Sequence, residues 1–251
     1  MSLAPLRKLL SPEPSSNLLI IDDAEVRVSY RRNSRAKRII LRIDRKGDGV
    51  VITLPPGVGK TKALNFAIQQ SGWIKKHLHK RIDQVSFTDG ALIPFQGTLH
   101  SIEHRPKMRG TVWIELAGNE DQMPLICVAG DEIHLPRRVQ DWLKRQAREE
   151  LSRACARYAS SMGLTYKRIS IRDTSSRWGS CSSAGTLSFS WRLVLAPAEV
   201  LDYVAAHEVA HLREMNHGSN FWALVESHCG HTKPSKTWLK KHGPDLHRYG
   251  A

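Results

Sequence analysis

Short apolar runs alternate with turn residues in the N-terminal part of the chain. The runs LLII, VRVSY, RIILRI and VVITL are rich in β-branched residues and are separated by Asp, Asn and Gly, which is typical of short strands. They predict a β-meander within residues 18–56. In residues 60–85 the apolar positions recur at helical spacing, which predicts an amphipathic helix packed on the meander. Residues 93–136 return to strand-like runs with turns between them.

A long helix is predicted to begin at Pro136 and to end at Met162. Proline is favoured in the first turn of a helix, and Gly163 is the residue expected at a left-handed cap. We place a domain boundary at this proline. Residues 17–135 then form a β-rich N-terminal subdomain with one helix, and residues 136–251 form a second subdomain.

The second subdomain continues with strands around a polar loop. YKRISIRD is predicted to be a strand, SSRWGSCSSAG a loop, and TLSFSWRLVLAP a strand or strand pair. An exposed strand edge at this place can pair with an extended peptide. An edge with a purely structural role agrees with the sequence equally well.

The most informative stretch is H-E-V-A-H-L-R-E-M-N-H, at residues 207–217. Apolar residues before and within it predict a helix with one buried side. Residues four apart lie on one face of a helix, so His207 and His211 can bind one metal ion. Glu208 lies beside that face, where its carboxylate can accept the proton of a metal-activated water. Chance is the alternative explanation for so short a motif, and a third histidine at a suitable offset argues against it.

His217 can join this site only if the chain turns back. Ten residues of continuous helix rise about 15 Å, whereas a Zn–N bond is about 2 Å long. We therefore expect the helix to end near Met215, with Asn216 and Gly218 making the turn in the left-handed conformation. His207, His211 and His217 would hold one Zn²⁺ per chain.

Composition limits the remaining possibilities. With 251 residues, 41% hydrophobic and 25% charged, the chain is an ordinary globular protein. It contains no apolar run of membrane-spanning length, and its first residues lack the apolar core of a signal peptide. We therefore expect a cytoplasmic protein without a membrane partner. The four cysteines stand singly, which predicts buried thiols and no disulfide framework.

The formal net charge of +14 raises the question of nucleic-acid binding. A solvated basic edge is the simpler interpretation, because the charges are spread along the chain. A nucleic-acid-binding surface is the alternative. The densest basic run consists of Arg31, Arg32, Arg35, Lys37 and Arg38, followed by Arg42, Arg45 and Lys46.

Histidines also occur in the C-terminal part of the chain. They have no carboxylate or thiolate in a recognisable ligand pattern beside them in the sequence, so the sequence does not predict a second metal site. These histidines are His228, His231, His242 and His247.

Three segments, RWGSCSSAG, FSWRLVLAPAEVLDYVAAHEVAHL and NHGSNFW, together resemble the YgjP-like metallopeptidase family. More distant similarity extends to the WLM and SprT-like proteases, which act on proteins crosslinked to DNA. The metzincin spacing of ligands also fits, but Glu214 occupies the position of the glycine in that pattern. The resemblance implies a zinc-dependent peptidase with Glu208 as general base and the three histidines as ligands.

The resemblance also draws attention to the loop before the metal helix. Arg177, Trp178 and Ser180 match the family's loop and would contact substrate, with Arg177 a candidate for binding an oxyanion. The alternative is structural, with Trp178 packed under the metal helix and the serines capping turns. Cys181 could approach the zinc as a thiolate.

We therefore predict an α+β protein in which an N-terminal β-rich subdomain precedes a helical zincin-like metallopeptidase subdomain with a small sheet. It would hydrolyse peptide bonds in a peptide or protein substrate, using zinc and Glu208. The alternative is a DNA-associated protein whose zinc site is structural or auxiliary, including a protease that acts on DNA-bound proteins. Steep loss of DNA binding with rising salt would distinguish these hypotheses.

Overall fold

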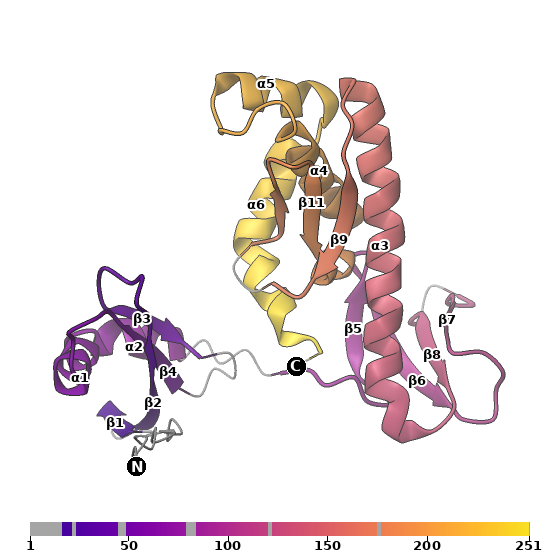
Figure 1. Cartoon of the computed structure of the whole chain (residues 1–251). Helices are drawn as coiled ribbons and strands as arrows, with labels where there is room; N and C mark the ends of the chain where they lie inside the picture. Colours follow the sequence, from indigo (N-terminus) through magenta and orange to yellow (C-terminus); the bar gives the residue numbers. More distant parts are fainter. Residues whose placement is uncertain are drawn as a thin grey trace, which may run out of the picture. The chain divides into compact units, whose positions relative to one another are not determined.

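The computed structural model describes residues 17–21, 24–44, 49–78, 84–119, 122–174 and 177–250. Its contacts divide the chain into two units, one ending at Ile82 and the other beginning at Asp83 (Figure 1). Two residues of the basic run, Arg45 and Lys46, lie outside the described residues, as do the first two serines of the polar loop.

The first unit is a small mixed sheet with two helices. Alternating apolar residues of the strands bury one face, with Val28 and Ile52 fully inaccessible, and Ala63, Ala67 and Ile74 of the helices pack in the same core. The strands are β1 (Asn17–Ile21), β2 (Ala24–Arg32), β3 (Ile40–Ile43) and β4 (Gly49–Leu54), and the helices are α1 (Lys60–Gln69) and α2 (Ser71–Leu78).

This sheet is not a meander. Its strand order is β1-β2-β4-β3, with β2 and β4 parallel and the other neighbours antiparallel. β4 takes the central position because its residues are mostly buried, whereas β3 is half-exposed and suits the edge. The predicted helix of residues 60–85 is also interrupted, since α1 is capped at Gln70 before α2 begins.

The second unit is built around the long helix α3 (Leu135–Met162), which Figure 1 shows running the length of the unit. Gly163 caps α3 in the left-handed conformation, as predicted. A four-stranded sheet of order β5-β6-β8-β7 packs against α3. Its strands are β5 (Leu92–Phe95), β6 (Thr98–Arg105), β7 (Val112–Glu115) and β8 (Leu125–Ala129), and the short helix η1 (Glu132–His134) leads into α3.

A second, three-stranded sheet of order β10-β11-β9 lies beside α3 and α4. β11 pairs in parallel with β9 and antiparallel with β10, so β10 forms an edge of this sheet within the described chain. The elements are β9 (Arg168–Arg172), β10 (Gly179–Cys181), β11 (Thr186–Ser190), η2 (Trp191–Leu195), α4 (Ala198–Ala210), α5 (Ser219–His228), α6 (Thr232–His242) and η3 (Gly243–Arg248).

The architecture is α+β, as predicted. Both sheets of the second unit share one core with α3 and α4, in which Ile93 and Ile126 pack together with Leu143, Phe189 and Val204. The contacts therefore divide the chain before residue 84 rather than near Pro136, where the sequence places the boundary.

Candidate metal centre

Helix α4 carries the first two histidines of the motif at its C-terminal end. Its apolar residues, including Val200, Val204 and Val209, are buried in the core of the second unit. His207 lies in the last turn, and His211 caps the helix. The packing of α4 therefore fixes the backbone from which both imidazoles project.

The chain turns back earlier than the sequence predicts. α4 ends at Ala210 rather than near Met215, because Leu212 and Arg213 donate short-range backbone hydrogen bonds to the carbonyls of Val209 and Ala210. Neither Asn216 nor Gly218 has a positive φ. The predicted left-handed turn at these two residues is therefore wrong.

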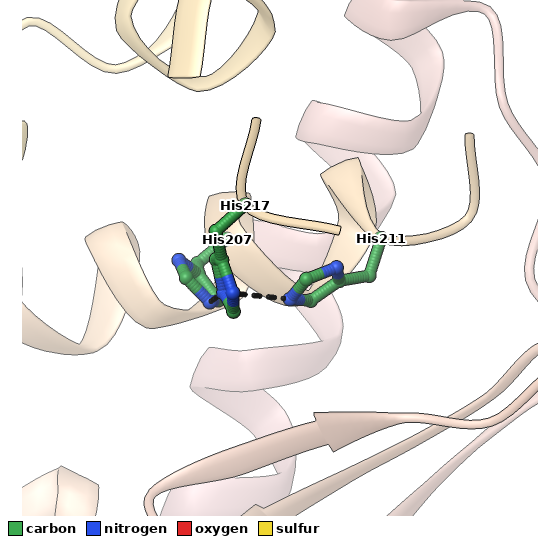
Figure 2. Close-up of side chains that lie close together, drawn as sticks. All are labelled: His207, His211 and His217. Carbon is green, nitrogen blue, oxygen red and sulfur yellow. Dashed lines mark hydrogen bonds between the residues drawn. The ribbon is translucent and has the colours of Figure 1, made fainter. Parts of the chain in front are cut away.

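The turn brings the three imidazoles together (Figure 2). The Nε2 atom of His217 lies 3.0 Å from His207 Nε2 and 3.2 Å from His211 Nε2. Three nitrogens bound to one tetrahedral Zn²⁺ at about 2.0 Å would be about 3.3 Å apart. The convergence of three nitrogen donors thus fits a metal ion of this size.

A backbone hydrogen bond holds the His211 imidazole in the tautomer that binds metals through Nε2. His211 Nδ1 donates to the Glu214 carbonyl at 2.9 Å, which leaves the lone pair of Nε2 directed into the cluster. Burial lowers the pKa of His207 to about 3 and also lowers the pKa of His211. Both rings are therefore neutral at physiological pH, as a ligand must be.

Phe221 packs against all three imidazoles. Its side chain is fully buried, and its ring centroid lies 4.9, 4.5 and 4.8 Å from those of His207, His211 and His217. Trp222 covers His217 with a stacked ring at 5.8 Å. The aromatic pair thus restrains the orientation of the whole cluster.

Glu208, the residue after His207, carries a buried carboxyl group. It is 5% exposed, and its Oε2 atom has no hydrogen-bond partner among the described residues. Burial raises its pKa to about 7, and the positive charge of Arg177 opposes that shift. A carboxyl group with such a pKa can both accept and return a proton near neutral pH.

The YgjP-like family model, described as a metallopeptidase domain, matches residues 37–242. The chain belongs to the YgjP-like metallopeptidase family. A metal ion and a peptide or protein substrate follow from that membership.

Two further comparisons accompany the family match. The crystal structure of the metallopeptidase zymogen of Pyrococcus abyssi abylysin is similar over 36% of this chain and 93% of that chain, with 21% identity and a TM-score of 0.33. No curated protein matches the sequence.

None of the described helices combines the length and apolar character needed to cross a membrane.

The loop that resembles the YgjP-like pattern leads into β10. Arg177 is exposed and close enough to Glu208 to lower its pKa. Trp178 stacks on His247 of η3, with centroids 4.9 Å apart, and packs against the core of the second unit, to which α4 contributes. Ser180 lies in the middle of β10, opposite Ser188 of β11. Of the three residues predicted to contact substrate, Arg177 is therefore the one with an electrostatic link to Glu208.

Cys181 is separate from the histidine cluster. The potential ligand group formed by His207, His211 and His217 does not include it among the described residues. Burial and the charge of Glu208 raise the pKa of its thiol, which disfavours the thiolate needed for metal binding. The structure gives no support to a zinc–Cys181 contact.

A cavity of about 550 Å³ opens beside His211. The sequence does not indicate this cavity. Its walls come from the residues after α3, the β10–β11 turn and the segment after α4. Only the meeting of three distant loops creates it, so no local pattern could have indicated it. Its lining includes Tyr166, Lys167, Ser182, Leu212 and Met215.

Proposed function

We propose that this chain is a zinc peptidase that cleaves peptide bonds, with His207, His211 and His217 holding the metal. The observation that carries the proposal is the meeting of three Nε2 atoms, one of them from the residue that precedes Glu208, whose carboxyl is buried. A bound Zn²⁺ would supply a Lewis acid that polarises a carbonyl group and acidifies a water molecule.

Glu208 would act as the proton carrier. Its unpartnered Oε2 atom is available to accept a proton from the attacking water. With a pKa of about 7, the carboxyl group can then donate that proton to the leaving amine. Arg177, exposed beside Glu208, is the candidate to bind the developing oxyanion.

The free edge of β10 is the candidate position for the peptide. Trp178 O accepts from Ser190 N, and Ser182 N donates to Thr186 O, so these residues use their backbone groups to bind β11. In an antiparallel ladder such pairs alternate, which leaves the backbone groups of Gly179 and Cys181 facing away from β11. An extended substrate would add to the sheet there.

The test combines zinc content with hydrolysis of an unfolded protein such as casein. Wild-type protein is expected to bind zinc and to cleave the substrate, and both properties should be lost with a chelator and restored by Zn²⁺. His217→Ala is expected to bind about one zinc fewer per chain and to be inactive. A His217→Ala variant with full zinc content would overturn the ligand assignment.

A second candidate function is recruitment to DNA, with the peptidase acting on DNA-bound proteins. The observation in its favour is a run of exposed cations on and around β2 and β3. Binding of duplex DNA that weakens steeply with salt would support it, and binding independent of salt or absent would argue against it. The exposed residues are Arg31, Arg32, Arg35, Lys37, Arg38 and Arg42.

A further inference from the structure

A second group of potential metal ligands lies away from the three histidines. Asp202 of α4, Cys229 at the end of α5 and His231 before α6 each offer one atom, and these atoms lie within 4.8 Å of one another. His231 Nε2 is 3.1 Å from Asp202 Oδ2 and 3.4 Å from Cys229 Sγ. The fold thus adds the carboxylate of Asp202 to the thiol of Cys229, which lies two residues before His231 in the sequence.

These separations are close to those of a tetrahedral zinc site. With a Zn–S bond of about 2.3 Å and Zn–N and Zn–O bonds of about 2.0 Å, sulfur and nitrogen lie about 3.5 Å apart and nitrogen and oxygen about 3.3 Å apart. The observed distances from His231 Nε2 to Cys229 Sγ and to Asp202 Oδ2 are slightly shorter than these values. The Nε2–Nε2 distances in the histidine cluster are shorter than their ideal value by a similar amount. A small shift would admit an ion.

The carboxylate of Asp202 is oriented by its neighbours. Arg157 binds Oδ1, and the Tyr158 hydroxyl donates to Oδ2. Hydrogen bonds such as the one from the Tyr158 hydroxyl commonly orient a carboxylate that binds a metal. The Oδ2 atom of Asp202 still has a lone pair facing His231. Arg157 is a competing cation, but its side chain is 59% exposed and is held through the other oxygen.

The cluster also offers access and rigidity. Asp202 and His231 line a cavity of about 340 Å³, so an ion and a water can enter from solvent. Cys229 is 2% exposed, and its carbonyl accepts from the Thr232 hydroxyl at 2.7 Å, which fixes the short connection between α5 and α6. An exposed thiol would oxidise, whereas this one is protected.

We propose that Asp202, Cys229 and His231 form a second site for a thiolate-binding divalent cation, with Zn²⁺ the expected ion. The mixed sulfur, nitrogen and oxygen donors favour zinc over magnesium or calcium. The ion would tie α4, which carries His207, to the α5–α6 connection. This role does not depend on the proposed peptidase activity.

The test is to load the full-length protein with Co²⁺ in place of zinc and to record its absorption spectrum. A thiolate bound to Co²⁺ gives a near-ultraviolet charge-transfer band that an all-histidine site does not give. Wild-type protein is expected to bind about two zinc ions and to show the band with Co²⁺. Cys229→Ala should lose the band and about one zinc per chain. Cys181→Ala, which removes the thiol of β10, should keep both.

The outcomes separate this site from the catalytic one. His207→Ala is expected to keep the thiolate band even though it loses the other metal, so failure of the peptidase proposal leaves this result unaffected. Absence of the band in folded wild-type protein saturated with Co²⁺ would overturn the proposal, and so would a band that persists in Cys229→Ala. Should Cys229→Ala fail to fold, His231→Gln is expected to shift or abolish the band, and an unchanged band there would also overturn it.

Discussion

Gly179 lies directly against the carboxyl group of Glu208: a Cβ atom added at residue 179 would come within 2.4 Å of Glu208 Oε1 and 2.6 Å of its Cγ. Glycine leaves the space that the buried carboxyl occupies. The edge strand β10 and the helix α4 therefore meet at the group to which we assign the proton transfer.

Gly179→Ala is expected to lower kcat by about 100-fold, because a displacement of about 1 Å at a catalytic group has an effect of that size. Zinc content should stay at the wild-type level, since the three atoms that a Cβ at residue 179 would approach most closely all belong to Glu208. Gly72→Ala is the matched control, because a Cβ at that position meets no atom within 4 Å. Equal kcat in the two variants would contradict the assigned contact.

The outward-facing backbone of β10 gives a second prediction. Cys181→Pro removes one N–H group from the free edge and leaves the bonds to β11 intact, whereas Cys181→Ala retains that N–H. One lost hydrogen bond of about 0.5–1.5 kcal/mol corresponds to a kcat/KM for casein-derived peptides roughly two- to tenfold lower in the proline variant than in the alanine variant.

Ser180→Pro provides the contrast for that experiment. Its N–H faces β11, so this substitution is expected to destabilise the sheet and lower the melting temperature. If Cys181→Pro and Cys181→Ala had the same kcat/KM, the peptide would not bind at the edge of β10.

The stack between Trp178 and His247 predicts a pH effect on stability. Burial, with a smaller contribution from Arg192, lowers the pKa of His247 below its ordinary value of 6.5. Below about pH 6.5 the unfolded chain therefore binds a proton that the folded chain resists, and the free energy of unfolding falls as pH falls. The stabilising effect of neutral His247 is complete above that pH.

His247→Phe keeps an aromatic ring against Trp178 and removes the titratable group. Denaturant unfolding at about pH 8 and about pH 5 is expected to show a smaller loss of stability for this variant than for the wild type. A loss as large as that of the wild type would mean that His247 titrates normally in the folded protein.

The local chemistry of the site could be predicted from the sequence, because helical periodicity alone brings His207 and His211 to one face. The meeting of His217 with them was also expected from the spacing, and the three nitrogens do converge. The turn itself was not predictable, because it uses short-range hydrogen bonds after Val209 and Ala210 rather than a residue type that stands out in the sequence.

Tertiary pairing accounts for what the sequence did not indicate. Nothing local shows that β4 inserts between β2 and β3, since apolar runs predict strands and not their neighbours. The approach of Gly179 to Glu208 has the same origin, as does the cluster of Asp202 with His231: both join segments that are far apart in the chain.

The most direct test of the account is a comparison of Glu208→Gln with the wild type, measuring zinc per chain and the rate of casein cleavage on the same samples. The glutamine keeps the shape of the side chain but cannot carry the proton, and the three histidines are untouched. We expect unchanged zinc content with cleavage reduced by at least about 100-fold. Wild-type cleavage by Glu208→Gln at full zinc content would contradict the proposed role of Glu208.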